Sequence, residues 1–326
     1  MSNNTKWDEI AAQLLASIEE GRPPWQRDWN TPAGTVVAFW PTNVASGKPY
    51  RGCNAMILLY QSQNMGWADL RFLTFNQARV AGGMVRKGEK GTFVFLFLPM
   101  VKLPSPLNGK IVWSADDPVL LKAFPGRLPA GTERFGVQRG YTVFNVTQVD
   151  GLPSVEAMVE TVEAPEGTDP ACAKAHVLAR LCAGSVLVKH GHDTPAYAPG
   201  SDRVLMPERK NFETQSGYYA ALFHEFAHAS GSPKRLNRDA KGTQDSVAYA
   251  IEELVAESGA AFVTASVGLS YQSQHADYLA EWARKLRKAF PNPADVLMRA
   301  FSAGQKAADC VLAGLPDAQA AVRHAA

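Results

Sequence analysis

The chain has 326 residues, of which 46% are hydrophobic and 20% are charged, and its net charge is +2 at neutral pH. This length and composition predict a folded protein with room for two cores, and they exclude a disordered chain. The longest apolar run, at residues 93–101, is too short to span a bilayer, so no membrane partner is expected. Four scattered cysteines without a C-x-x-C pair, and a polar N-terminus, favour a reducing, cytoplasmic location.

The first half of the chain mixes helix and strand patterns. Helical spacing of apolar residues, with Gly and Pro at the ends, predicts short helices near residues 7–20, 54–63 and 75–81. Thr74 is the expected N-cap of the last of these. The segment 84–102 is interpreted as a hairpin with KGEKG at its turn, followed by a buried strand, and a further strand is expected within residues 140–150.

Composition changes at residues 154–170, which are acidic and contain Pro and Gly. We interpret them as a linker between a domain of residues 1–153 and a domain of residues 171–326, with a long surface loop as the alternative. The second domain is mainly helical, with a strand pair within residues 195–207. Its expected helices lie near residues 172–185, 215–230, 246–266, 275–289 and 295–313. The predicted fold class is therefore α+β, with an α+β first domain and a mainly helical second one.

The stretch LFHEFAHASG at residues 222–231 has the spacing of a metal-dependent hydrolase. On a helix His224 and His228 share one face and can bind one ion, while Glu225 lies beside them as a general base. Three interpretations stay open at this point: a peptidase site, a structural metal site, and two surface histidines without a metal.

A catalytic zinc site needs a third protein ligand and an open fourth position. The following helix offers Glu253 and Glu257 one turn apart on a shared face, with Glu252 about 100° away from Glu253. We assign Glu253 as the ligand and Glu257 as the acceptor of a histidine N–H, and the exchanged assignment stays open. The segment 201–207 is either an edge strand that pairs with an extended peptide or an ordinary sheet edge, and Tyr197 and His192 are candidate oxyanion donors.

The first half also has the composition of a single-stranded nucleic-acid groove. Between residues 41 and 90 there are seven basic residues and two acidic ones. Aromatic residues are interleaved with them: Trp25, Trp29, Trp40, Tyr50, Trp67, Phe72 and Phe75. Cationic side chains bind phosphates and aromatic faces stack on bases, although about half of these aromatics are expected in the core.

Several strings together resemble a known family. PWQRDW, PTNVASGKPYRGCNAM, RFLTFNQARVAGGMVRKGEKGTFVFLF and FNVTQVDGLP resemble the N-terminal domain of ArdC-type antirestriction proteins and the related region of TraC-type plasmid primases. AYAPGSDRVLMP, YYAALFHEFAHASG and EELVAESGAAF resemble the zincin-like metallopeptidase domain that follows it in ArdC. The resemblance runs from about Trp7 to Cys310. It departs from the family at WQRDW, where a Pro is expected before the second Trp.

The resemblance implies a bacterial antirestriction protein of a conjugative plasmid, delivered to the recipient cell during conjugation, that binds single-stranded DNA. It implies His224, His228 and Glu253 as ligands of a divalent metal, Zn²⁺ or Mn²⁺, with Glu225 as the base. The candidate DNA contacts within the matching strings are Lys48, Tyr50, Arg51, Asn54, Arg71, Arg86, Lys87 and Lys90. A protein substrate or a host restriction component is a further expected partner. The alternatives are a DNA-associated metalloprotease and a non-catalytic DNA-shielding module with a structural metal.

Overall fold

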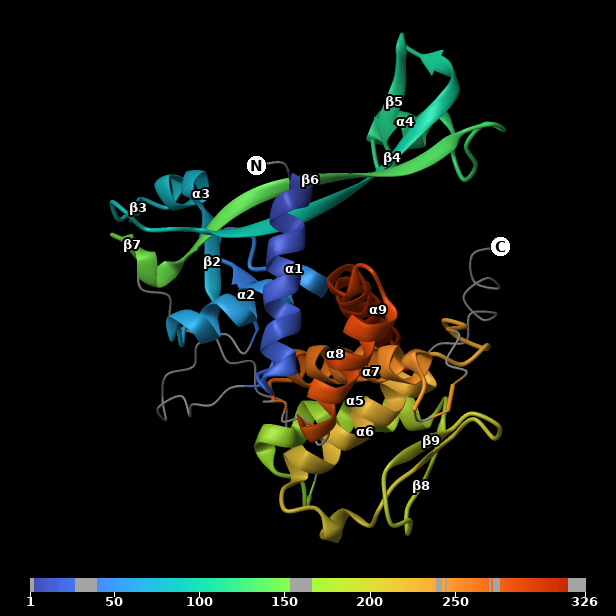
Figure 1. Ribbon diagram of the computed structural model, residues 1–326. Coiled ribbons are helices and arrows are strands. Elements are labelled where there is room, and N and C mark those ends of the chain that lie inside the picture. The colour runs from blue at the N-terminus through green and yellow to red at the C-terminus, as the bar shows by residue number, and fades with distance from the viewer. Residues whose placement is uncertain are drawn as a thin grey trace.

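The computed structural model describes residues 3–26, 40–152, 166–238, 242–243, 245–269, 271 and 276–315. Within these residues the protein combines helices and sheets in an α+β fold, as the sequence predicts (Figure 1). No helix in this part of the chain is long and apolar enough to cross a membrane. Trp29 and most of the expected linker at 154–170 lie outside the described residues, so the domain boundaries stay a prediction.

The first half is built on a five-stranded sheet with the strand order β1-β2-β6-β4-β5. Its strands are β1 (Thr42–Asn43), β2 (Arg71–Thr74), β4 (Thr92–Leu107), β5 (Lys110–Ser114) and β6 (Glu133–Asn145). The helices are α1 (Asn3–Glu19), α2 (Gly52–Met65), α3 (Phe75–Val80) and α4 (Pro118–Ala123), followed by a 3-10 turn, η1 (Val146–Gln148). α3 begins with a capping box, in which Thr74 Oγ1 accepts from the Gln77 N–H at 3.2 Å and Gln77 Oε1 accepts from the Thr74 N–H at 2.8 Å.

Two expectations for residues 84–102 were wrong. The short strand β3 (Met84–Val85) does not form a hairpin with β4 but pairs with β7 (Val149–Asp150), more than 60 residues further along the chain. The strand β4 is not buried along its whole length, because Leu96 is 42% and Phe97 51% exposed. β4 leaves the body of the protein together with β6, and Figure 1 shows the two as a long arm that ends in β5 and α4.

The second half consists mainly of packed helices with a small sheet. Its helices are α5 (Ala173–Ala183), α6 (Gln215–Ala229), α7 (Val247–Ser266), α8 (Ala276–Ala289) and α9 (Pro293–Leu312), with 3-10 turns η2 (Pro170–Cys172) and η3 (Arg209–Asn211). The sheet has the order β8-β10-β9, formed by β8 (Leu187–Lys189), β9 (Ala196–Ala198) and β10 (Arg203–Leu205). β10 is therefore the central strand with partners on both sides, and the expectation that residues 201–207 form an edge was wrong.

The two halves share one hydrophobic core. Leu14 of α1 and Met56 of α2 belong to the same buried cluster as Phe223 of α6 and Phe301 of α9. In Figure 1, α1 runs from the sheet of the first half down to the helices of the second. The expected aromatic residues of the first half mostly contribute to this core, since Trp25, Trp67 and Phe72 are buried.

Glycines allow α7 and α9 to approach closely. A Cβ added at Gly304 of α9 would lie 2.1 Å from Ser258 Oγ and 3.0 Å from the Val255 carbonyl oxygen, both on α7. A Cβ added at Gly259 would lie 3.2 Å from the Ala227 side chain of α6 and 3.3 Å from the Gly304 carbonyl oxygen. These distances are shorter than ordinary van der Waals contacts, so any side chain at Gly304 would push α7 away from α9.

We predict that Gly304→Ala destabilises the protein by about 1–3 kcal/mol, because the clash with α7 outweighs the higher helix propensity of Ala. Urea unfolding monitored by circular dichroism measures the change. Gly136→Ala is the matched control, since nothing lies within 4 Å of a Cβ at that position. Equal unfolding free energies for the two variants would contradict the close packing of α7 on α9.

Candidate metal centre

The HExxH motif lies on a core helix. α6 is capped by Thr214, whose side chain accepts from the Gly217 N–H at 3.0 Å, and its residues from Tyr218 to Ala229 are buried except His228. α7, capped in the same way by Ser246, packs against it. His224 is 4% exposed and the His228 side chain 16%, so neither histidine lies on the open surface of the helix.

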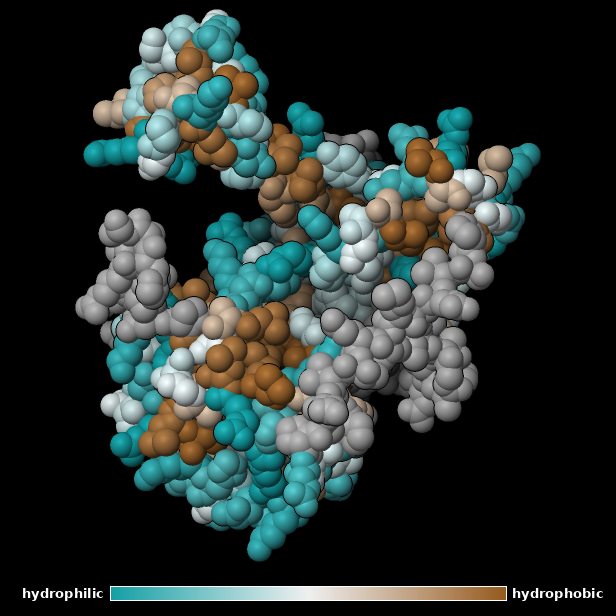
Figure 2. Space-filling model, turned by 180° about the vertical axis from the view of Figure 1, so that it is seen from behind, coloured by the Kyte–Doolittle hydropathy of each residue, from teal (hydrophilic) through white to brown (hydrophobic). Residues whose placement is uncertain are grey.

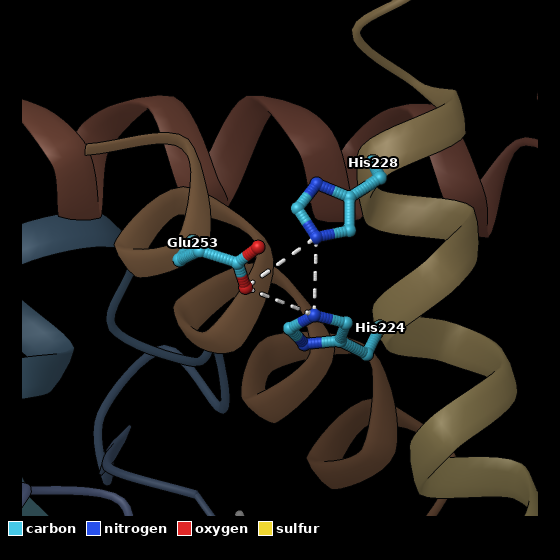
Figure 3. Close-up of side chains that lie close together, drawn as sticks. All are labelled: His224, His228 and Glu253. Carbon is cyan, nitrogen blue, oxygen red and sulfur yellow. Dashed lines mark hydrogen bonds and ion pairs between the residues drawn. The ribbon is translucent and has the colours of Figure 1, made fainter. Parts of the chain in front are cut away.

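Three side chains converge between these helices (Figure 3). The Nε2 atoms of His224 and His228 lie 3.1 Å apart, and Glu253 Oε2 lies 3.5 Å from the first and 3.6 Å from the second. Ligand atoms held about 2.1 Å from a tetrahedral ion are about 3.4 Å apart. The spacing of these three atoms fits a single divalent cation between them, and the three residues are a group in the described part of the chain that could hold a metal ion.

Each histidine has a second carboxylate at its other ring nitrogen. Glu257 Oε1 lies 3.6 Å from His224 Nδ1, and its other oxygen accepts from the Tyr271 hydroxyl at 2.8 Å. Glu252 Oε1 lies 3.3 Å from His228 Nδ1. A carboxylate at Nδ1 fixes the ring and directs Nε2 toward a metal. Glu253 thus lies on the Nε2 side of both rings and Glu257 beside His224 Nδ1, and the assignment of Glu253 as ligand and Glu257 as acceptor stays a prediction.

No role for Glu252 or Arg238 is evident from the sequence. Arg238 Nη2 donates to Glu252 Oε1 at 2.6 Å and to the Ala227 carbonyl at 2.7 Å, and its Nη1 donates to Ser230 Oγ at 2.8 Å. Arg238 thus joins the end of α6 to the carboxylate that orients His228. The available signal was a pair of arginines shortly after the motif helix, where cations satisfy the last carbonyls of the helix.

The buried groups change one another's proton affinity. Burial lowers the pKa of His228, but hydrogen bonds to Glu252 and Glu253 outweigh this effect and raise it to about 10. The pKa of His224 is also raised, because Glu253 outweighs burial there. Burial raises the pKa of Glu253, yet its bonds to the two histidines lower it overall. The raised pKa values of the histidines mean that a cation bound between them competes with protons, so metal binding should weaken as pH falls.

A second ionic cluster ties the sheet to the end of α6. Asp202 accepts from the Tyr197 hydroxyl at 2.8 Å and from Arg235 Nη1 at 3.0 Å, and Lys234 Nζ lies 3.1 Å from it. Arg235 also donates to the Ala229 carbonyl at 2.8 Å. The Tyr197 hydroxyl donates its proton to Asp202. This hydrogen bond was not expected when Tyr197 was considered as an oxyanion donor.

The candidate DNA contacts of the first half have different environments. Three arginines are ion-paired: Arg51 with Asp309 at 2.5 Å, Arg71 with Asp69 at 2.7 Å, and Arg86 with Glu89 at 2.8 Å and Asp150 at 3.2 Å. Asn54 holds the backbone of Phe95, accepting from its N–H at 2.8 Å and donating to its carbonyl at 2.5 Å. The Tyr50 hydroxyl accepts from Asn43 at 3.1 Å, and burial raises its pKa.

The three candidate lysines differ from the arginines. Lys48, Lys87 and Lys90 are exposed and have no ion pair among the described residues. Cations that are not neutralised by a nearby carboxylate keep their full attraction for phosphates. Of the eight candidate DNA contacts, these three stay the most available, and the whole set stays a prediction.

Comparison with known proteins identifies the family. Residues 5–106 match the N-terminal domain of anti-restriction factor ArdC, and residues 175–292 match a zincin-like metallopeptidase domain. The uncharacterized protein y4eC of Sinorhizobium fredii is 33% identical over 96% of this chain and 93% of its own length. The metal-free crystal structure of antirestriction protein ArdC from plasmid R388 superposes with a TM-score of 0.68 at 28% identity, covering 95% of this chain and 97% of that one. This chain belongs to the ArdC family.

Two further relatives of this ArdC-family chain are of interest. The Mn(II)-bound structure of the same R388 protein has a TM-score of 0.66 and covers 96% of this chain and 99% of that one. A DNA primase named TraC from Escherichia coli is 34% identical over 94% of this chain. The chain spans only 27% of the length of that primase. The family membership thus agrees with the resemblance given by the sequence strings, and it supports a divalent metal in the second half.

We predict that Arg238→Gln weakens Zn²⁺ or Mn²⁺ binding roughly 10- to 100-fold, because Glu252 then loses the group that orients it on His228. Isothermal titration calorimetry measures the dissociation constant. Arg235→Gln is the matched control, since Arg235 also bonds a carbonyl at the end of α6 but bonds Asp202 in place of Glu252. The same loss in both variants would show that the end of α6, and not Glu252, controls affinity.

We also predict a pH-dependent contribution of Asp202 to stability in this ArdC-family chain. Burial opposes its ionisation, but hydrogen bonds from its three partners outweigh burial and lower its pKa to about 2. The unfolded value is about 3.9, so ionised Asp202 stabilises the fold above about pH 4, and this contribution disappears as pH falls toward 2.

The substitution Asp202→Asn should therefore cost on the order of 2 kcal/mol near neutral pH, and the difference from wild type should shrink below about pH 4. Urea unfolding at a series of pH values measures this difference. Asp193→Asn, at an exposed position, should show no such trend. A difference that stays constant down to about pH 2.5 would contradict the lowered pKa.

Proposed function

We propose that this chain is a plasmid-encoded antirestriction protein that binds single-stranded DNA through its first half and carries a metal-dependent peptidase site in its second. The observation that carries the proposal is the convergence of His224, His228 and Glu253 in a chain of the ArdC family. The antirestriction function named for the R388 relative, which covers nearly the whole chain, supports the biological role. The single-strand partner is inferred from the cations and aromatic residues of the first half.

The ligand set supports a catalytic site over a structural one. Structural zinc sites are closed by four protein ligands, whereas catalytic sites use three and leave a position for water. The cluster found among the described residues has three members, two imidazoles and one carboxylate. A divalent cation held there supplies Lewis acidity and lowers the pKa of a bound water molecule. Zn²⁺ and Mn²⁺ both suit this donor set.

Glu225 has the position of the general base. It follows His224 directly on α6, is 5% exposed, and its negative charge contributes to the raised pKa of both histidines. In this role its carboxylate takes a proton from water and returns it to the leaving amine. The neighbouring carboxylates Glu252 and Glu257 are held by the ring nitrogens and by Arg238 and Tyr271, so Glu225 is the one left for proton transfer.

The test is protection of a conjugative plasmid entering a restricting recipient cell. We expect Glu225→Ala to retain metal by elemental analysis and to lose protection, since removal of a general base costs about 10²- to 10⁴-fold in rate. His224→Ala should lose both metal and protection, whereas Glu213→Ala, an exposed change just before α6, should lose neither. Full protection by Glu225→Ala with metal retained would contradict the peptidase role and favour a structural metal in a non-catalytic protein.

A further inference from the structure

The arm formed by β4 and β6 is a regular two-stranded ribbon. The strands pair without a slip from Thr92 opposite Val143 to Lys102 opposite Glu133. The tip contains a separate small core of Val101, Leu103, Trp113 and Leu120. Figure 1 shows that the tip stands away from the helices of the second half. Because the register is constant, residues directly opposite each other point to the same face of the ribbon.

The two faces of the ribbon have different surroundings. One face is contacted at its base by α1, where the ring of Trp7 lies 4.8 Å from that of the buried Phe95 and 5.7 Å from that of Phe97, which stays 51% exposed. The other face, which we name the ribbon face, consists beyond Val94 of Leu96, Leu98, Met100, Phe135, Val137, Arg139 and Tyr141. Figure 2 shows apolar surface on the side of the arm that faces the viewer, between the tip and the body of the protein.

The ribbon face exposes aromatic rings together with a cation. Tyr141 and Phe135 are each 41% exposed. Arg139 lies between them on β6, is exposed, and has no ion pair among the described residues. At the strand rise of about 3.3 Å per residue, Arg139 is about 7 Å from Tyr141 and about 13 Å from Phe135. Residues 96–141 contain six basic and three acidic residues, so the arm as a whole attracts anions.

We propose that the ribbon face binds unpaired bases of single-stranded DNA, with Tyr141 and Phe135 stacking on bases and Arg139 contacting a phosphate. The proposal rests on the proposed function and gives it a surface outside the eight candidate contacts. The arginines of those contacts are neutralised by carboxylates, whereas Arg139 is not. Exposed aromatic rings beside an unpaired arginine on a strand are suited to bases that have left a duplex, because only such bases present both faces.

Binding of a fluorescent 20-nucleotide oligo-dT, measured by anisotropy with the full chain, tests the aromatic residues. Tyr141→Ala and Phe135→Ala should each raise the dissociation constant roughly 5- to 100-fold. The matched control is Leu121→Ala, which removes an exposed apolar side chain at the tip of the arm, away from the ribbon face. Circular dichroism spectra and thermal unfolding curves equal to those of wild type confirm that all three variants are folded.

The charge is tested by two arginines on the same strand. Arg134 is also exposed, but it lies opposite Val101 and therefore points to the other face of the ribbon. Arg139→Gln should weaken binding and reduce the slope of log K against log salt by about 0.7, as expected for one lost phosphate contact with a single strand. Arg134→Gln should leave the slope unchanged. An equal effect of both substitutions would show that binding depends only on the total charge of the arm, and not on a phosphate contact at Arg139.

The outcomes separate this proposal from the proposed function. If Tyr141→Ala and Phe135→Ala bind the oligonucleotide as tightly as wild type, the ribbon face is not the binding surface. Single-strand binding by the chain would still stand. No wild-type binding at any salt concentration would overturn both. If sedimentation velocity shows that wild type self-associates and Tyr141→Ala does not, the face is a contact between copies of the chain, and the proposal is wrong.

Discussion

The packing of α6 against α7 is the contact on which the rest of the site depends. Because α6 is surrounded by protein, its two imidazoles cannot be solvated and must find partners on the neighbouring helix. α7 provides these partners, the buried carboxylates of Glu252, Glu253 and Glu257. Together with Glu225, these groups are four carboxylates beside one guanidinium, that of Arg238. A divalent cation bound between the helices would therefore reduce the excess negative charge of a buried cluster.

The sequence predicted the parts of this site that depend on helix periodicity alone. His224 and His228 follow from the i, i+4 spacing within α6, and Glu253 follows from its position on the next helix, α7. Arg238 and Glu252 were missed, because they act across the contact between the helices, which has no signature in either segment. The pairing of β3 with β7 was missed for the same reason: the KGEKG segment has the composition of a hairpin turn, but the partner strand lies far along the chain.

Local charge counting was misleading in the first half for a related reason. The basic excess of residues 41–90 is real, but Arg51 is neutralised by Asp309 and Arg86 by Glu89 and Asp150, and two of these three carboxylates lie outside that window. The apolar run at residues 93–101 was interpreted as buried because its faces cannot be distinguished when both are apolar. Only the pairing with β6 shows that one face of the ribbon packs against Trp7 of α1, whereas the other carries the exposed Leu96, Phe135 and Tyr141.

α7, the helix that carries the carboxylates of the candidate metal site, also joins the two halves of the protein. Phe262 of α7, a little more than two turns beyond Glu253, has its ring 4.9 Å from that of Trp40. α9, which packs on α7 through Gly304, contacts the first half with Phe301 against Trp25 and with Asp309 bonded to Arg51. The residues that position the metal site thus belong to the same core as the residues that anchor the sheet. Opening either half would expose apolar surface of the other, so the described parts of both halves should unfold as one cooperative unit.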